Sequence, residues 1–338
     1  MKYLCPRDFR RGEMEENMKI AYLLQSDRDY DEVVETLNQL VKQNDHAFIM
    51  INSDDLRDKV SFTFADHPRV HISRTQEFAQ EGDLSLARGT IIQIKDSLQY
   101  DHFDYYINLT DGMIPIKKRE DIVKFLEKDP TKDYYYVAHQ ETPELKKKAD
   151  KYYTFTNVIA FPRSRFIRGM TKASAAFFAK FGFKRHLSEP YQIGSPWFML
   201  TGRTGQILAE HFDYVSNTFK LSWYPEEMYI PMMMDKFVYI NGREDDHINK
   251  DYRVVGPDGS WQESSGAKPL TEELLQNHPD ALFGGMITAE DNMDLYQNYF
   301  DKYNETILLE EEKKEKTFID PELLLRSMNN AKKNQDDR

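Results

Sequence analysis

The chain has 338 residues, of which 40% are hydrophobic and 30% charged, and its formal net charge is −12. This composition is typical of a globular protein with enough chain for a large core, and it excludes the basic footprint of a nucleic-acid-binding protein. The only cysteine, Cys5, excludes a disulfide framework within one chain and favours a reducing cytoplasm. No run approaches the roughly 20 apolar residues of a membrane-spanning helix.

The two ends of the chain differ from its middle. Residues 1–17 lack the apolar core of a signal peptide, so we expect an extension, poorly ordered, without a fold of its own. Residues 306–338 are rich in charge and predict a solvated helix or tail. We therefore expect one composite domain over residues 18–305. The expected location is the cytoplasm, and association with the inner face of the membrane is an open alternative.

The first half of the chain alternates short apolar runs with segments of helical periodicity. The order strand, helix, strand, strand, helix, strand is typical of the nucleotide-binding half of an α/β protein. We therefore predict a mixed sheet flanked by helices. The predicted strands are 19–24, 47–51, 70–72 and 103–109, and the predicted helices are 29–42, 84–99 and 118–127.

The second half is less regular, and its longest turn-rich stretch, residues 254–266, predicts a loop. Thr271 is a suitable N-cap for the last helix before the charged tail. The predicted helices here are 173–181, 204–211 and 271–277, with a short strand at 197–200.

The strand at 103–109 ends abruptly in Thr110, Asp111 and Gly112. Ligands of open α/β sheets bind just beyond the carboxyl ends of such buried strands. Asp111 is therefore a candidate for contacting a nucleotide, a phosphate or a metal ion. Asp-Gly is also ordinary turn chemistry, and the sequence leaves both interpretations open.

The sequence contains no glycine-rich phosphate loop, no HExxH and no CxxC motif. Acidic clusters are the remaining candidates for chemistry. Asp27 and Asp29 have the spacing of a pair that holds a divalent cation. Acids at this position are, however, more often the favoured first-turn residues of a helix.

Glu226 and Glu227 follow Pro225, which suits the first position of a helix. Both acids would then lie in the first helical turn. One interpretation is compensation of the helix dipole. The other is a carboxylate at the rim of a pocket, where neighbouring aromatic residues desolvate it and raise its pKa.

Six segments, taken in order, resemble one family: the core-2/I-branching β-1,6-N-acetylglucosaminyltransferases with their peptide O-xylosyltransferase relatives, glycosyltransferase family fourteen. The resemblance covers roughly residues 20 to 290. The segments are IAYLLQSDRD at 20–29, GDLSLARGT at 82–90, NLTDGMIPIK at 108–117, GSPWFMLT at 194–201, PEE at 225–227, and the stretch 268–291.

The resemblance implies a GT-A-like fold that binds a nucleotide sugar and an inverting transfer from a UDP-sugar, with GlcNAc as the expected sugar. It places Glu227 on the family's catalytic base. The implied acceptor-binding residues are Glu226, Ser195 and Trp197, whose ring would stack on sugar. The implied donor-binding residues are Gln25, Asp27, Asn52, Asp54, Asp111, Arg253 and Lys268.

The chain also departs from the family pattern. The family has a lysine for the diphosphate near its C-terminal end, whereas residues 282–286 here read LFGGM. The family's acid at the strand end falls on Met113, and Asn52 replaces an aspartate. The animal members are cysteine-rich Golgi membrane proteins, and the lack of both features here fits a bacterial cytoplasmic version.

We therefore expect an enzyme that adds a sugar to a hydroxyl of a bacterial surface glycan or glycoprotein. No cofactor is expected to be required, although a divalent cation on Asp111 remains an alternative. Two other functions stay open: a non-catalytic glycosyltransferase-like partner protein, and a metal-dependent transferase with another donor. The expected partners are the UDP-sugar and the acceptor, without nucleic acid; peripheral membrane association and self-association are open.

Overall fold

A computed structural model describes residues 18–285 with several gaps. The contacts divide the chain into two compact units, residues 1–292 and 293–338, and every described residue belongs to the first. The predicted boundaries at residues 17 and 305, and the predicted tail, lie outside the described part. The gaps within 18–285 are Arg28, Asp111, 159–163, His186, Ser188, 241–243 and 256–270.

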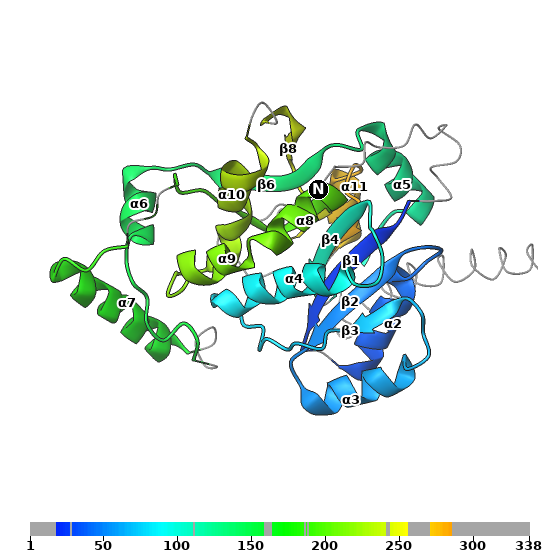
Figure 1. The fold of residues 1–338 in the computed structure, drawn as a ribbon, viewed down its shortest axis with the longest axis horizontal. Helices are drawn as coiled ribbons and strands as arrows, with labels where there is room; N and C mark the ends of the chain where they lie inside the picture. Colours follow the sequence, from blue (N-terminus) through cyan, green and yellow to red (C-terminus); the bar gives the residue numbers. More distant parts are fainter. Residues whose placement is uncertain are drawn as a thin grey trace, which may run out of the picture. The chain divides into compact units, whose positions relative to one another are not determined.

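The described chain is built around a seven-stranded mixed sheet in the order β3-β2-β1-β4-β7-β6-β8 (Figure 1). The first four strands of this order are parallel, β7 runs antiparallel to both β4 and β6, and β8 is parallel to β6. The predicted α/β class with a mixed sheet is confirmed. The strands are β1 (Ile20–Ser26), β2 (His46–Ile51), β3 (Val70–Ile72), β4 (Tyr105–Thr110), β6 (Asp133–His139), β7 (Ile193–Thr201) and β8 (His247–Asn249).

A second, three-stranded sheet has the order β5-β10-β9. Its strands are only two residues long: β5 (Ile114–Pro115), β9 (Arg253–Val254) and β10 (Phe283–Gly284). The short sheet therefore brings the segment after β4 together with two segments from the end of the described chain.

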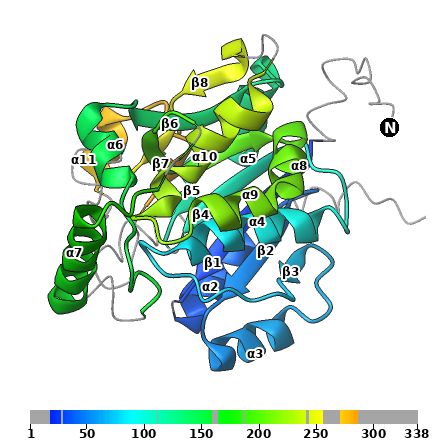
Figure 2. The same cartoon turned by 60° about the vertical axis from the view of Figure 1, so that its left-hand side comes forward.

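Helices cover both faces of the large sheet (Figure 2). The first face is covered by α2 (Tyr30–Leu40), α3 (Asp54–Thr63) and α5 (Arg119–Lys128). The second is covered by α4 (Leu84–Ser97), α8 (Gly202–Glu210), α9 (Phe212–Thr218) and α10 (Tyr229–Met233). The remaining helices are α6 (Pro143–Ala149), α7 (Arg165–Lys180), α11 (Glu272–Asn277) and the short helical turns η1 (Pro225–Glu227), η2 (Met234–Val238) and η3 (Glu244–Asp246).

The two faces carry separate hydrophobic cores because successive side chains of a strand point to opposite faces. In β1, Tyr22 and Leu24 enter the core under α2, α3 and α5, whereas Ala21 and Leu23 enter the core under α4. Burial on both faces explains why the central strands read as continuous apolar runs rather than as an alternating pattern.

All predicted strands and helices within the described residues are present, and α7 and β7 are several residues longer than predicted. The predicted helix 173–181 is the C-terminal part of α7, and the predicted strand 197–200 is the middle of β7. Thr271 caps α11 as expected, with its hydroxyl accepting from the Leu274 amide. Residues 253–254, by contrast, form β9, so the predicted loop at 254–266 begins with a strand residue.

Several elements were not predicted, namely α3, α6, α9, α10 and the strands β5, β6, β8, β9 and β10. The largest omission is β6, because this strand joins β7 and β8 and completes the sheet.

Asp29 caps α2, with its carboxylate accepting from the Asp31 amide at 3.0 Å. This favours the first-turn interpretation of the Asp27/Asp29 pair. Within the described residues, no helix is both long and apolar enough to cross a membrane.

A buried ion pair ties the start of β2 to α5. Both Asp45 and Arg119 are buried, and the guanidinium donates to the carboxylate at 2.6 and 2.8 Å. Arg119 also donates to the Met18 carbonyl, and Asp45 accepts from the Ile20 amide. The pair thereby satisfies backbone groups at the first residues of the described chain.

Removing one partner of this pair should be strongly destabilising. Asp45→Asn leaves the Arg119 guanidinium buried without its counter-charge, which costs about 3–5 kcal/mol of unfolding free energy. Urea unfolding followed by circular dichroism measures the loss. The matched control is Asp55→Asn in the exposed pair with Lys59, which should cost less than about 1 kcal/mol. Equal losses at the two sites would contradict the structural role of Asp45.

Candidate functional site

The chain order reverses direction at the centre of the sheet. From β1 the chain continues to β2 and β3 on one side, and then returns to β4 on the other side of β1. In open α/β sheets, such a switch point leaves a crevice at the carboxyl ends of the strands where ligands bind. Here it lies beyond Ser26 and Thr110, the last residues of β1 and β4.

Gln25 links this edge of the sheet to the first turns of α4. Its amide nitrogen donates to the Leu86 carbonyl at 3.0 Å and to the Thr90 hydroxyl at 2.8 Å. Its amide oxygen is buried and has no hydrogen-bond partner within the described chain. Gly89 permits this close approach, because a Cβ there would lie 2.8 Å from the Gln25 amide oxygen.

Asn52 lies beyond β2 and holds the loop that leads to α4. Its amide exchanges two hydrogen bonds with the backbone of Ala79, at 2.8 and 2.9 Å. Asp54, at the start of α3, is 84% exposed and pairs with Arg57 at 2.7 Å. Asp27 is exposed after β1. These three predicted donor-binding residues therefore share the carboxyl edge of the sheet, and Asn52 already shapes its loop.

Glu226 and Glu227 lie in η1, and both carboxylates are buried, with 6% and 4% of the side-chain surface exposed. Tyr224, just before the turn, has φ 51° and ψ 62°, which is strained for an aromatic residue. The residue that precedes the three-residue turn therefore has an unfavourable backbone conformation. Such strain clusters at functional sites and is held by the surrounding packing.

Glu226 is bound to the segment just before α4. One carboxylate oxygen accepts from the Gly82 amide at 2.5 Å, and the other is buried without a hydrogen-bond partner in the described part of the chain. Gly82 has φ 79°, a conformation that suits glycine. Burial, and then the charge of Glu227, raise the pKa of Glu226 well above its usual range.

The acid pair and the carboxyl end of β1 meet through α4. The hydroxyl of Tyr229, two residues beyond Glu227, interacts electrostatically with Thr90 and Glu226. Thr90 is the residue to which Gln25 donates. Gln25 and Glu226, about two hundred positions apart in sequence, are thus both held at the start of α4.

The other side of the edge is formed by the start of β7. Because Ile107 lies opposite Met199 in the antiparallel pair β4–β7, the residues before Met199 lie toward the carboxyl end of β4. Trp197 is half-buried there and packs against the first core, and its amide donates to the Ser195 hydroxyl at 3.2 Å. Both predicted acceptor-binding residues of this strand therefore reach the predicted edge.

Arg253 is buried between β4 and β7. Its guanidinium donates to the carbonyls of Asn108 and Phe198 at 2.9 and 2.8 Å, and to the Asp251 carbonyl at 2.8 Å. Burial lowers the pKa of Arg253 to about 10, partly opposed by Asp251. These contacts pin the strands together, and only Nε is buried without a hydrogen-bond partner among the described residues.

Two predicted residues, Asp111 and Lys268, lie outside the described residues. The described residues on either side of Asp111 are Thr110 and Gly112: Gly112 has φ 72°, and the Thr110 carbonyl accepts from the Met113 amide. Met113, where the resembled family has its acid, is fully buried in the first core. Among the described residues, no cluster of three His, Cys, Asp or Glu side chains could hold a metal ion.

Sequence reasoning assigned no role to Gly82, Asp251 or Tyr229. The signal that could identify Gly82 is a glycine directly before the helix N-cap Asp83. Asp251 is buried and accepts from the Arg253 amide at 3.4 Å, and burial raises its pKa. No sequence pattern indicates this burial.

The raised pKa of Glu226 predicts a pH-dependent penalty on folding. Above a pH of about 4, the unfolded carboxyl loses its proton while the native one keeps it, so native stability falls as pH rises toward the native pKa. Glu226→Gln keeps the oxygen that accepts from Gly82 and abolishes the titration. The free energy of unfolding of the variant, relative to that of the wild type, should therefore increase with pH by at most about 1.4 kcal/mol per pH unit.

Chemical denaturation at several pH values above 4 measures this difference. The control, Glu210→Gln on the exposed side of α8, removes one negative charge from the same acidic chain and should not reproduce the slope. A difference between wild type and Glu226→Gln that stays constant with pH would show that Glu226 is not held in its protonated form.

No known family model matches the chain, and no curated protein matches it in sequence. Solved structures similar to it include a glycosyltransferase involved in the glycosylation of the major capsid of PBCV-1, at 11% identity and a TM-score of 0.38, covering 82% of this chain and 98% of that one. HddC from Yersinia pseudotuberculosis matches at 13% identity and a TM-score of 0.27, covering 62% of this chain and 86% of that one. At these scores we base no functional assignment on the likeness, and membership of glycosyltransferase family fourteen stays a prediction.

Proposed function

We propose that the protein is an inverting glycosyltransferase that moves a sugar from a nucleotide-sugar donor to an acceptor hydroxyl. One observation carries the proposal: a buried pair of carboxylates joined through α4 to the carboxyl end of β1, at the switch point of the sheet. The switch point is where α/β proteins bind nucleotides. A buried carboxylate beside it is the group that proton removal from a hydroxyl requires.

In the proposed reaction, the acceptor oxygen attacks the anomeric carbon as the bond to the nucleoside diphosphate breaks. Glu227 takes the proton of the attacking hydroxyl, and the leaving diphosphate keeps the electron pair of the broken bond. Attack from the opposite side inverts the configuration of that carbon. Holding the hydroxyl, the base and the donor in one geometry supplies much of the rate enhancement.

Glu226 has a different role in this proposal. Its burial and the neighbouring charge of Glu227 favour the protonated form, which donates a hydrogen bond rather than accepting a proton. The oxygen without a partner would bind a hydroxyl of the acceptor. Two adjacent carboxyls would thereby differ in function, because burial raises the pKa of Glu226. Trp197 would stack on a sugar ring, and Ser195 would position that strand.

The donor nucleotide is assigned to the edge formed by Gln25, Asp27, Asn52, Asp54 and Asp111. UDP as the nucleotide, GlcNAc as the sugar and a bacterial surface glycan or glycoprotein as the acceptor follow from the family resemblance alone. Neutralisation of the diphosphate has three candidates: Arg253, Lys268 and a divalent cation on Asp111. We favour Lys268 over Arg253, because the guanidinium of Arg253 is already committed to strand carbonyls.

A non-catalytic partner protein is the second candidate function. Residues 282–286, LFGGM, lack the base that the resembled family uses for the diphosphate. The described part of that segment is buried in the short sheet beside β5. A protein that stabilises an active transferase would need neither the donor nor Glu227.

Replacing Glu227 by Gln should reduce turnover by about 10²–10⁴-fold and leave donor affinity nearly unchanged, because the amide fills the same space but cannot accept the proton. A screen of nucleotide sugars for slow hydrolysis measures turnover without knowledge of the acceptor, and calorimetry measures donor affinity. Glu210→Gln is the surface control and should behave as wild type. Undiminished turnover in Glu227→Gln would refute the mechanism, and the absence of both binding and hydrolysis with every donor would favour the partner protein.

A metal requirement is tested separately by chelation. If a lysine or arginine neutralises the diphosphate, turnover should be unchanged in EDTA within about twofold, since cationic side chains then supply the stabilisation. A loss of turnover that Mg²⁺ or Mn²⁺ restores would instead assign the diphosphate to a metal ion. In that case, Asp111→Asn should weaken the restoring effect of the metal.

A further inference from the structure

The α7 arm, residues 164–185, exposes an unusual number of large apolar side chains. Phe166, Phe177, Phe181 and Phe183 are between 58% and 73% exposed, and Met170 is 37% exposed. These make up half of the exposed large hydrophobic residues in the described chain. The rings of Phe177 and Phe181 lie 4.7 Å apart and form one patch. Such clustering, unlike scattered apolar residues, marks a surface that binds something.

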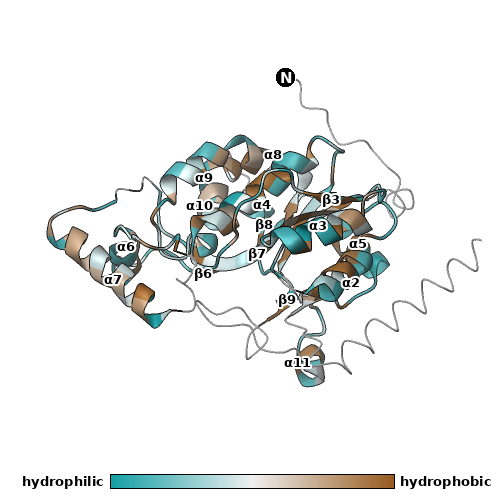
Figure 3. Ribbon diagram, turned by 90° about the horizontal axis from the view of Figure 1, so that it is seen from below, coloured by the Kyte–Doolittle hydropathy of each residue, from teal (hydrophilic) through white to brown (hydrophobic). Residues whose placement is uncertain are grey.

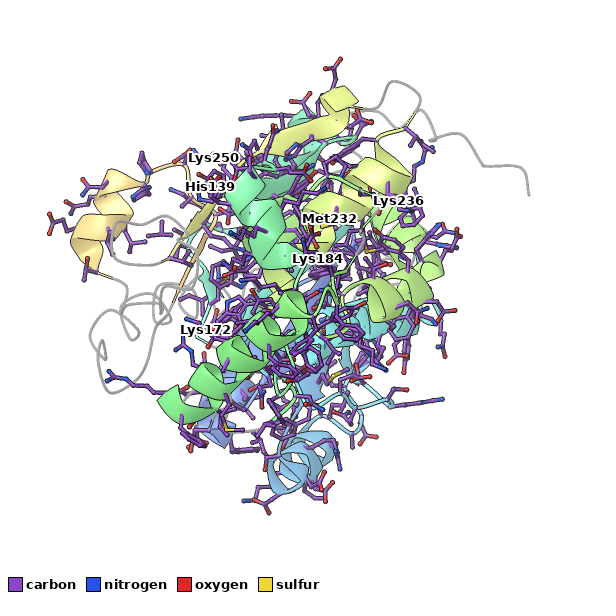
Figure 4. The ribbon with its side chains drawn as sticks, turned by 90° about the vertical axis from the view of Figure 1, so that its left-hand side faces the viewer. His139, Lys172, Lys184, Met232, Lys236 and Lys250 are labelled. Carbon is purple, nitrogen blue, oxygen red and sulfur yellow. The ribbon has the colours of Figure 1, made fainter. Side chains whose placement is uncertain are left out.

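All the charged residues of the same arm are basic. It contains no Asp or Glu, although the whole chain carries a net charge of −12. Its exposed cations flank the phenylalanines, because Lys180 ends the helix between Phe177 and Phe181 and Lys184 follows Phe183. Figure 4 places Lys172 and Lys184 along the arm, and Figure 3 shows hydrophobic stretches along α7. The basic residues of the arm are Arg165, Arg168, Lys172, Lys180, Lys184 and Arg185.

The inward face of α7 is already occupied. Ala175 packs in a small core with Tyr153, Trp223 and Tyr224, and the Lys172 ammonium lies 5.2 Å from the centre of the Trp223 ring. Helical spacing places Phe166, Met170 and Phe177 on the side away from this core. The apolar patch is therefore not needed to hold the arm in place.

We propose that the α7 arm docks the protein on a membrane surface that carries anionic phospholipids. Exposed phenylalanines insert at the boundary between headgroups and acyl chains, and lysines and arginines beside them attract anionic headgroups. Anionic lipid is favoured over the arm of a second copy as the occupant, because pairing two arms would bring two sets of cations together.

The position of the arm gives this docking a consequence. Trp223 and Tyr224, against which α7 packs, directly precede the turn Pro225–Glu227. The side chain of Arg168 also interacts electrostatically with Tyr224. A membrane bound to the outward face of α7 would therefore lie one helix away from the acid pair. The docking itself does not rest on the proposed function.

Co-sedimentation of the full chain with vesicles tests the proposal. The protein should bind vesicles of phosphatidylcholine with phosphatidylglycerol, bind poorly to phosphatidylcholine alone, and lose binding as salt is raised. Two double variants should each lower the vesicle-binding constant roughly tenfold or more. They are Phe177→Ser with Phe181→Ser, and Lys180→Glu with Lys184→Glu. The controls are Phe62→Ser, which removes a ring that is 87% exposed on α3, and Lys124→Glu on α5.

Equal binding to neutral and anionic vesicles, no binding to either, or binding that the arm variants leave unchanged would overturn the proposal. So would a dimer, measured by sedimentation velocity without lipid, that the phenylalanine variant alone dissociates, because the patch would then belong to a second copy. The charge-reversal pair alters only exposed side chains, so it decides the question even if the phenylalanine variant folds poorly. Thermal unfolding of each variant identifies that case.

Discussion

The central strands β1 and β4 are covered on both faces, and the rest of the molecule depends on this constraint. Every residue of β1 from Ile20 to Leu24 is buried, as is every residue of β4 before Thr110. A strand in this position can carry a polar side chain along its length only where that side chain is hydrogen-bonded, as Asn108 is to Pro196 and Phe198. The less buried polar side chains lie where the strand ends. Gln25 and Thr110 are the first less buried residues of their strands. The same constraint concentrates candidate chemistry at one edge of the sheet.

Helix α4 connects that edge of the sheet to the acid pair. Its first turns receive Gln25 from the sheet, and the residue before its N-cap donates to Glu226. Tyr229 adds an electrostatic interaction with Thr90 and Glu226. Because these contacts come from three separate stretches of chain, the acid pair is held in place although it lies on a turn of three residues. The strained conformation of Tyr224 is compatible with such support.

The two carboxylates illustrate how burial and proximity determine chemistry. Adjacent acids on an exposed helix would both be ionised and would contribute little beyond a favourable helix dipole. Here one oxygen of Glu226 accepts from the Gly82 amide, while its second oxygen has no partner among the described residues. Desolvation therefore dominates, and the protonated form of Glu226 is favoured. The pair provides two different functional groups from one residue type.

Helices and strands with a clear hydrophobic periodicity could be predicted from the sequence, and those with a weak periodicity could not. The buried strands β1, β2 and β4 and the helices α2, α4 and α5 follow from apolar runs and helical spacing. By contrast, α3 buries only Leu56 and Val60, which is too sparse a stripe to identify. Strand β6 was missed because it begins with Asp133, whose burial depends on hydrogen bonds from Thr201 and Thr204 of another segment.

The α/β class and the position of Glu226 and Glu227 at the start of a helical turn could be predicted from the sequence. These are local properties, set by hydrophobic periodicity, proline and helix-capping residues. Three other features follow only from the packing of distant segments: Glu226 is buried against Gly82, Gln25 reaches the same helix, and Arg253 is committed to strand carbonyls. Each of those contacts joins residues more than fifty positions apart, so its energy depends on the packing of the whole sheet and is not encoded in any one segment.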